Sequence, residues 1–515
     1  MQQPNKLYQS RIFDSRILEK ALLFRDFLIY LHLLEKNNLN MSKLSVVLKK
    51  FPRVFWISNI MELFERWAWY GFYNAFALYL TLSKDTGALG FTQVQKGVII
   101  GTGSMLLYFL PVITGAIADR LGYKKMLILS YTSYVAGYFM VGTFESYGLV
   151  FAAYIFLAVA GALFKPIIQG TIAKTTTDET ASVGFGIFYV MVNIGGFIGP
   201  FIAGFLYKID WNLVFLMSII TIAINYVFVF IFYKEPDREP SNIKFLKNIG
   251  IAFHNIWIAI KNWKYVLFIL IMGLFWTAFN QLYYSFPIFL EQWVDMDRIG
   301  ALLGLAEGTI TAPTITSMDA FFIIVLQMWV SSVSSRYRPL HSIIAGIGIL
   351  GAGLLLMFIG QNPWIMLVGL LVFGIGEMAS SPKFNEYVGR IAPPDKKALY
   401  MGTVFLAIAI GHFLAGWVSG KPFEVLADKY YLLSKAVQDK GLSIQPISEH
   451  FTQTQYFERA QELFGMDGQQ LTQYLWDTYH PSNVWYMFTG IAVGASILLL
   501  LYDRFILKGQ ANKVE

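Results

Sequence analysis

Long apolar stretches recur along the whole chain, and they restrict its possible folds more than any other feature. A transmembrane helix needs about 20 mostly apolar residues, and twelve segments meet that requirement. We place these segments at 54–83, 94–118, 124–143, 148–173, 183–207, 211–233, 264–290, 318–335, 339–360, 364–389, 398–420 and 483–507. We therefore predict an all-α polytopic membrane protein with twelve transmembrane helices.

The composition excludes several other classes of protein. Hydrophobic residues make up 56% of the chain and charged residues 14%, whereas soluble proteins average about 25% charged residues. There are no cysteines, which excludes a disulfide-stabilised scaffold. The net charge of +7 requires no nucleic-acid partner, because basic residues in cytoplasmic loops account for it. We expect membrane lipid around the helices, and no nucleic acid, metal or organic cofactor.

The distribution of basic residues predicts the orientation in the membrane. With the N-terminus inside, the inner segments contain fifteen Lys and Arg residues and the short outer loops contain three, Lys84, Lys208 and Arg298. Basic residues concentrate on the cytoplasmic side of membrane proteins. We therefore expect both termini to be cytoplasmic and the protein to lie in the plasma (inner) membrane.

The spacing of the spans divides the chain into two halves. A long inner loop follows the sixth span, which is the repeat pattern of major facilitator transporters, with two six-helix bundles. The predicted organisation is an N-terminal cytoplasmic extension (1–50), a first bundle (51–233), a linker (234–263), a second bundle (264–507) and a cytoplasmic tail (508–515).

Two segments do not belong to this helical core. Residues 1–40 are charged throughout and lack the apolar core of a signal peptide. We interpret them as an extension without structural role, and Met41 as a plausible start. Residues 421–482 lie between the last two spans and contain amphipathic stretches at 422–436 and 455–464. A solvated cap is the favoured interpretation of this insertion, and a lid or partner site is the alternative.

The loop after the second span contains a recognisable motif. Gly115-Ala-Ile-Ala-Asp119-Arg120-Leu-Gly122-Tyr-Lys-Lys resembles the G-x-x-x-D-R-x-G-x-K/R-K/R loop of the major facilitator superfamily. The glycines allow close approach of helices, and Asp119 can cap a helix or pair across the interface of the halves.

Ionisable residues inside the spans are functional candidates, because a charge at mid-bilayer costs about 2.5–3.5 kcal/mol on insertion scales. Glu62, Glu65 and Arg66 lie in the first span. Their spacing of three and four residues places them on one helical face. Tyr70 and Tyr73 continue that face one and two turns later.

Single ionisable residues in four other spans are further candidates. Lys165 in the fourth span is followed by Pro166, which predicts a bend beside the charge. Asp319 begins the eighth predicted span and Glu377 lies in the tenth. A structural salt bridge is the alternative for each, and Asp319 can also lie at the outer interface. For His412 in the eleventh span, a hydrogen-bonded packing role is the favoured interpretation.

Motifs in five spans resemble the proton-dependent oligopeptide transporter family. Glu62-Leu-Phe-Glu-Arg-Trp-Ala-Trp-Tyr-Gly71 is similar to the family's E-x-x-E-R-F-x-Y-Y-G signature. The further matching segments are Tyr108–Pro111, Phe164–Pro166, Phe188–Gly195 and Gly376–Pro382.

The resemblance implies proton-coupled import of small peptides through a central cavity. Glu62 and Glu65 would be the proton-responsive carboxylates, pairing alternately with Arg66 and Lys165. The same two cations would lie near the carboxylate of the substrate.

The resemblance also implies the rest of the binding site. Asn193 and Glu377 would hold the amino group of the substrate. Tyr70 and Tyr108 would line the cavity, and we include Tyr73 and Asn280 among the candidate substrate contacts.

Three residues depart from the family pattern. Tyr73 stands where the family usually has a second arginine, and Asn280 stands where it has a glutamate in the seventh span. These two family residues resemble partners in a salt bridge, which is then lost as a pair. Asp319 replaces an asparagine, and we hypothesise that it joins Glu377 in a cation-binding or proton-sensing site. That change would favour substrates with cationic or multiple amino groups.

Other functions remain as alternatives. The first is a related proton-coupled carrier of a non-peptide, amine-bearing or other small solute. A non-transporting sensor or scaffold is less favoured, because the sequence shows no appended signalling domain. We expect no enzymatic activity, since no nucleophile–base set, metal-ligand spacing or phosphate loop is evident.

Overall fold

The structure is a computed structural model that describes residues 46–177, 179–236, 250, 254, 256–393 and 397–507. The predicted extension 1–40, the predicted tail 508–515 and most of the predicted linker 234–263 lie outside the described residues. The chain from Arg53 onward forms one unit, and it contains all of the predicted spans.

The first half is built around one central helix, α4, which packs against α8, α9 and α10. Its aromatic and aliphatic residues are buried on most sides, as expected for a helix enclosed by others. The helices of this half are α4 (Arg53–Thr81), α5 (Gln93–Phe109), α6 (Pro111–Leu121), α7 (Tyr123–Thr143), α8 (Tyr147–Lys174), α9 (Ala181–Leu206) and α10 (Trp211–Val227), which η2 (Phe228–Phe232) extends.

The second half repeats this plan with one span interrupted. Its seventh span consists of three consecutive helices, with breaks at Asn280 and Ser285. The helices are α12 (Trp263–Phe279), α13 (Gln281–Tyr284), α14 (Phe286–Trp293), α15 (Asp297–Leu302), α16 (Ala312–Ser334), α17 (Pro339–Leu356), η3 (Met357–Ile359), α18 (Pro363–Ile391), α19 (Lys397–Val418), α24 (Val484–Leu501) and η6 (Tyr502–Leu507).

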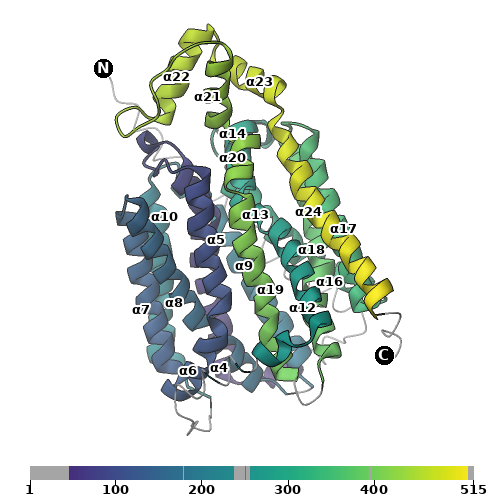
Figure 1. Ribbon diagram of the computed structural model, residues 1–515. Helices are drawn as coiled ribbons and strands as arrows, with labels where there is room; N and C mark the ends of the chain where they lie inside the picture. Colours follow the sequence, from purple (N-terminus) through teal and green to yellow (C-terminus); the bar gives the residue numbers. More distant parts are fainter. Residues whose placement is uncertain are drawn as a thin grey trace. The chain divides into compact units, whose positions relative to one another are not determined.

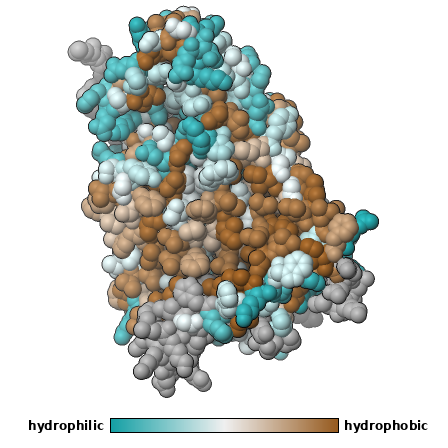
Figure 2. Space-filling view, viewed as in Figure 1, coloured by the Kyte–Doolittle hydropathy of each residue, from teal (hydrophilic) through white to brown (hydrophobic). Residues whose placement is uncertain are grey.

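The predicted twelve-helix membrane fold is confirmed. Nine helical segments of the described residues are long and apolar enough to cross a membrane by length and composition. The other three spans are the more polar α4, the pair α5–α6 that separates at Leu110, and α7. Apolar side chains cover the sides of the helices in Figure 2, and hydrophilic residues gather at the top over α21–α23.

The predicted start of the eighth span was wrong. Helix α16 begins at Ala312, where the Thr311 side chain caps the helix by accepting a hydrogen bond from the backbone N–H of Thr314. A run of threonines and a proline resembles a loop by composition, although proline is favoured in the first helical turn. Asp319 therefore lies about two turns inside the helix and is 3% exposed, not at an outer interface.

Pro166 lies within α8, which continues through it to Lys174. A proline inside a helix removes the hydrogen bond to the carbonyl four residues earlier, here that of Ala162. The Thr114 hydroxyl of α6 donates a hydrogen bond to this carbonyl at 2.5 Å. The Thr114 hydroxyl thus gives the Ala162 carbonyl the hydrogen bond that the proline nitrogen cannot donate.

Glycines bring the two halves together where α5 meets α19. A Cβ atom on Gly97 would lie 2.2 Å from the carbonyl oxygen of Gly416, and one on Gly416 would lie 2.3 Å from that of Gly97. Only glycine allows the two backbones to approach this closely. Beside this contact, the buried Lys96 ammonium of α5 donates hydrogen bonds to the carbonyls of Tyr284 and Ser419 in the second half.

The insertion 421–482, called the cap here, lies at this same end of the helices (Figure 1). It contains α20 (Lys421–Ala427), α21 (Lys429–Asp439), α22 (Gln453–Phe464), α23 (Gly468–Tyr479) and η5 (Pro481–Asn483). The helix predicted at 422–436 is divided at Asp428, which caps α21. The prediction missed α23, although Leu471 and Leu475 form its buried face and Asp467 begins a capping box.

One carboxylate of the cap contacts both halves. Asp428 Oδ2 accepts hydrogen bonds from Gln93 of α5 at 2.8 Å and from Gln292 of α14 at 3.1 Å. Its Oδ1 accepts the backbone N–H of Tyr431. Burial raises the pKa of this carboxyl group above its ordinary value, although these hydrogen bonds oppose the shift. The docked arrangement is therefore fully favoured in acid and loses stability as the pH rises through the raised pKa.

Replacing Asp428 should weaken docking of the cap. Asp428→Ala leaves the buried Gln93 and Gln292 amides without their acceptor, at a cost of about 1–3 kcal/mol for each unsatisfied group. We expect faster cleavage of the cap in limited proteolysis of the purified protein. Glu449→Gln is the control, because its ion pair with Lys84 is largely exposed and such pairs contribute about 0–1 kcal/mol. Equal protection of both variants would contradict the role of Asp428.

Candidate functional site

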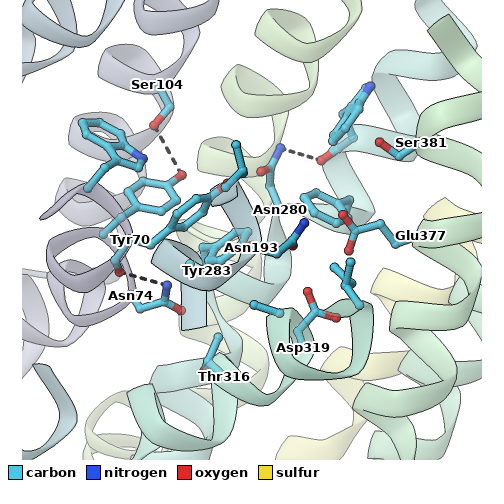
Figure 3. Close-up of a pocket in the computed structure, with 18 of the residues that line it drawn as sticks. Tyr70, Asn74, Ser104, Asn193, Asn280, Tyr283, Thr316, Asp319, Glu377 and Ser381 are labelled. Atoms are coloured by element: carbon cyan, nitrogen blue, oxygen red, sulfur yellow. Dashed lines mark hydrogen bonds between the residues drawn. The ribbon is translucent and has the colours of Figure 1, made fainter. Parts of the chain in front are cut away.

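A cavity of about 200 Å³ lies between the two halves. Helices α4, α5 and α9 line it from the first half, and α12, α13, α16, α18 and α19 line it from the second. Figure 3 shows polar side chains from both halves pointing into it. Seven of the predicted site residues line the cavity, namely Tyr70, Tyr73, Tyr108, Asn193, Asn280, Asp319 and Glu377.

Two acidic side chains lie together on the second-half side of the cavity. Asp319 of α16 and Glu377 of α18 both line the cavity and repel each other electrostatically. They are 3% and 9% exposed. No hydrogen-bond donor among the described residues reaches Asp319 Oδ1 or Glu377 Oε2, and both atoms are buried. The pair is therefore a concentration of unused acceptor atoms beside the cavity.

The charged face of α4 forms a separate, fully enclosed cluster. The Arg66 guanidinium lies 3.1 Å from Glu62 Oε1 and 2.5 Å from Glu65 Oε2. The Tyr134 hydroxyl of α7 donates a hydrogen bond to the other oxygen of Glu65. These side chains are almost completely buried, so the two carboxylates share one cation in an apolar environment.

The predicted cations Arg66 and Lys165 are not among the residues that line the cavity in this conformation, so their contact with the substrate stays a prediction. Among the described lining residues there is no lysine or arginine. The Arg66 guanidinium lies 5.8 Å from the centre of the Tyr70 ring, and the Lys165 ammonium lies 3.8 Å from that of the Tyr108 ring. Because Tyr70 and Tyr108 line the cavity, each cation lies behind an aromatic ring.

Lys165 also lacks the predicted ion pair with the α4 carboxylates in this conformation. Within the described residues, no carboxylate lies within 4 Å of its ammonium group. Both carboxylates still act on Lys165 through electrostatic attraction, and Arg66 repels it. In this conformation Glu62 and Glu65 therefore form their ion pairs with Arg66. This is one of the two predicted arrangements, and pairing with Lys165 is the other.

The residues that depart from the family pattern are neutral lining groups. The Tyr73 hydroxyl contacts Ser104 at 3.4 Å, and the Asn280 amide donates to the carbonyl of Trp276 in its own helix at 2.7 Å. Both residues are neutral, so neither position has a buried charge without a partner. This agrees with the prediction that both partners of the family's salt bridge are replaced together. Asn193, which also lines the cavity, similarly donates a hydrogen bond to the carbonyl of Tyr189 at 2.8 Å.

His412 has the packing role that the sequence favoured and also lines the cavity. Its Nδ1 lies 3.0 Å from the Tyr284 hydroxyl, and its ring stacks on that of Tyr108 at 4.8 Å. The ring therefore supports Tyr108 from the side of the second half.

The loop motif is only partly tested. Gly122 separates α6 from α7 with φ of 100°, a conformation that favours glycine. A Cβ atom on Gly115 would meet only Pro166, at an ordinary contact of 3.7 Å, so close helix approach does not explain this glycine. The side chains of Asp119 and Arg120 lie outside the described part of the structure.

Sequence reasoning missed several site residues. Tyr283, Asn74 and Ser104 line the cavity but fall in no motif that we used. Tyr134 is one of three tyrosines, with Tyr131 and Tyr138, that are fully buried along α7. Their spacing of three and four residues is a signal that could have indicated a polar contact with the charged face of α4.

The comparisons with known proteins identify the family. The family model described as Major Facilitator Superfamily matches residues 56–416. The chain belongs to the Major Facilitator Superfamily. This transporter is 24% identical over 433 residues to dipeptide and tripeptide permease B of Aeromonas hydrophila, covering 72% of this chain and 84% of the permease. It is 23% identical over 464 residues to a peptide transporter of Yersinia enterocolitica, covering 73% and 88%.

Solved structures support the same fold. A peptide transporter of the oligopeptide family in complex with sulfate has a TM-score of 0.68 and 16% identity, covering 90% of this chain and 96% of that one. A family member in complex with 5-aminolevulinic acid has a TM-score of 0.65 and 16% identity, covering 88% and 96%. The predicted membership in the major facilitator superfamily is confirmed, and the relatives and structures that resemble the chain are named as permeases and transporters, not enzymes.

Removing Arg66 should destabilise this transporter. Arg66→Gln leaves two carboxylates buried without their cation, which costs about 3–5 kcal/mol. We expect a lower melting temperature in detergent and a reduced yield of folded protein. The matched control adds Glu62→Gln and Glu65→Gln to the same variant, which removes the charges together and should restore most of the stability. If the triple variant melts no higher than the single one, the unpaired charges are not the cause.

Proposed function

We propose that this protein is a proton-coupled symporter that imports small peptides of the di- and tripeptide class by alternating access. The names of its relatives support the substrate class. The observation that carries the coupling is the enclosed cluster of Glu62, Glu65 and Arg66 on the helix that also supplies Tyr70 and Tyr73 to the cavity.

Proton binding would act through the pairing of Arg66. Protonation of Glu62 or Glu65 removes one negative charge and frees one side of the guanidinium group. In a low-dielectric interior, such a change in pairing is worth several kcal/mol. A ligand or proton can shift a two-state equilibrium only through its different free energies in the two states. Because α4 contacts α8, α9 and α10, its charge state can bias the whole first half.

The direction of transport follows from the orientation that we propose. The close contacts of α5 with α19 shut the end that bears the cap, so release would occur at the opposite end. We place that opposite end and both termini in the cytoplasm, and the protein in the plasma (inner) membrane, on the distribution of basic residues.

A second candidate is a proton-coupled carrier of a non-peptide, amine-bearing solute. The observation that favours it is the absence of lysine and arginine among the described lining residues, together with two acidic ones. A peptide has a carboxylate at one end, which gains no direct cation in this conformation. An amine without a carboxylate would fit the charge of the cavity equally well.

Neutralising the α4 carboxylates should abolish coupling. We expect Glu62→Gln and Glu65→Gln to lose concentrative uptake of labelled Ala-Ala in proteoliposomes under an inward proton gradient, at least tenfold below wild type. Counterflow exchange without a gradient should survive, because it needs binding and reorientation but no net proton transfer. Glu462→Gln, whose ion pair with Arg459 in the cap is exposed to solvent, is the control. Unchanged gradient-driven uptake in both α4 variants would contradict proton coupling.

Lys165 should be needed for turnover more than for folding. Its ammonium group has no close ion-pair partner among the described residues and lies over the Tyr108 ring. We expect Lys165→Ala to express and melt close to wild type while accumulating at least tenfold less substrate. A variant that folds poorly but has normal uptake per folded molecule would show that the lysine has only a structural role.

A further inference from the structure

The acidic pair beside the cavity takes no part in the proton coupling proposed above, and the family resemblance assigns only Glu377 to the amino group of the substrate. The proton-sensing carboxylates lie in the α4 cluster and share Arg66, whereas Asp319 and Glu377 lie in the second half on α16 and α18. Figure 3 shows both on the side of the cavity opposite Tyr70 and Asn74. The two groups are therefore available for a ligand.

Two carboxylates that are buried in the lining of one cavity repel each other, so ionising both is costly without a compensating cation. The described residues supply none, because every lining residue other than Asp319 and Glu377 is neutral or is the hydrogen-bonded His412. The nearest cations of the first half, Arg66 and Lys165, contact the rings of Tyr70 and Tyr108 without lining the cavity themselves. One carboxylate can hold a proton, but the pair then still has one negative charge.

The acceptor atoms of the pair point to a ligand with hydrogen-bond donors. Asp319 Oδ1 and Glu377 Oε2 are buried and receive no hydrogen bond from the described residues. An ammonium group has three donors and no acceptor. A buried polar atom without a partner is costly, so an ammonium group that reaches both carboxylates would gain charge-assisted hydrogen bonds at atoms that otherwise lack them.

Aromatic side chains around the cavity complement this preference. Tyr283 lines the cavity and lies 6.2 Å from Tyr70 between ring centres. Trp276 and Phe279 also line it. The faces of such rings attract cations, by about 0.5–2 kcal/mol. Both the charged and the uncharged parts of the lining thus favour a positively charged ligand.

We propose that Asp319 is a specificity-determining residue that, with Glu377, selects substrates carrying two neighbouring amino groups. Under the proposed peptide function, on which this inference rests, the substrate class is peptides whose N-terminal residue has a second amino group on a short side chain. One ammonium group would pair with each carboxylate, so that both are ionised without a net buried charge.

The test compares binding of three dipeptides to the purified protein by calorimetry. The probes are Ala-Ala, 2,4-diaminobutyryl-alanine and its reversed isomer alanyl-2,4-diaminobutyric acid, which has the same charge but carries the second amine at the other end. We expect wild type to bind 2,4-diaminobutyryl-alanine at least tenfold more tightly than the other two. In Asp319→Asn the preference for 2,4-diaminobutyryl-alanine over the other two dipeptides should fall to within about twofold.

Asp210→Asn is the matched control, because Asp210 is the exposed N-cap of α10 and asparagine caps helices equally well. Its preference should equal that of wild type. Equal affinity of wild type for Ala-Ala and 2,4-diaminobutyryl-alanine overturns the proposal, as does a preference that persists in Asp319→Asn.

Failure of the proposed function can be distinguished from failure of this inference. If no dipeptide binds wild type, the peptide function fails, and 1,3-diaminopropane then tests the pair alone. Binding of this diamine that is lost in Asp319→Asn supports the paired-amine site, and absence of that binding overturns it.

Discussion

The arrangement of the first half depends on one buried cation shared by two carboxylates. Arg66 holds Glu62 and Glu65 on a single face of α4, and Tyr134 of α7 completes the enclosure. None of these charges can be left unpaired in an apolar bundle without a cost of several kcal/mol. Because the ion pairs lie within α4, it is the hydrogen bond from Tyr134 of α7 to Glu65 that helps to fix the rotation of α4 relative to its neighbour. The same rotation directs Tyr70 and Tyr73, one and two turns later, into the cavity.

The cavity lies between halves with different electrostatic characters. On the first-half side the charges are enclosed, and the two cations contact the rings of the lining residues Tyr70 and Tyr108 without lining the cavity themselves. On the second-half side Asp319 and Glu377 lie in the lining itself. A cation behind a ring still acts on the cavity through the ring and through space, but it does not offer a hydrogen bond. In the proposed mechanism the first half therefore couples transport to protons, and the second half selects a positively charged substrate.

The sequence predicted much of this fold, and its failures have local causes. Apolar length and repeated spacing locate helices well, so α4, α8 and α18 lie close to their predicted bounds. The start of α16 was missed because capping threonines and Pro313 resemble a loop in composition. The positions of Arg66 and Lys165 behind aromatic rings could not be predicted from helical spacing. Spacing gives the face on which a side chain lies, whereas the neighbours that cover that face come from other helices.

The closed end near the cap combines the close packing of two helices with the buried ammonium group of Lys96, which water can hydrate when the halves separate. The glycine contact between α5 and α19 leaves no room for other side chains, which makes this closure geometrically specific. Beside it, the Lys96 ammonium group donates to two backbone carbonyls of the other half, and that of Ser419 lies just after the C-terminal end of α19. The carbonyl end of a helix attracts a cation. When the halves separate in the proposed cycle, water replaces these carbonyls and restores the hydration of the charge. The free-energy cost of separating the halves is therefore lower than it would be with an apolar side chain at this position. An apolar side chain would lose its packing contacts and gain no favourable hydration.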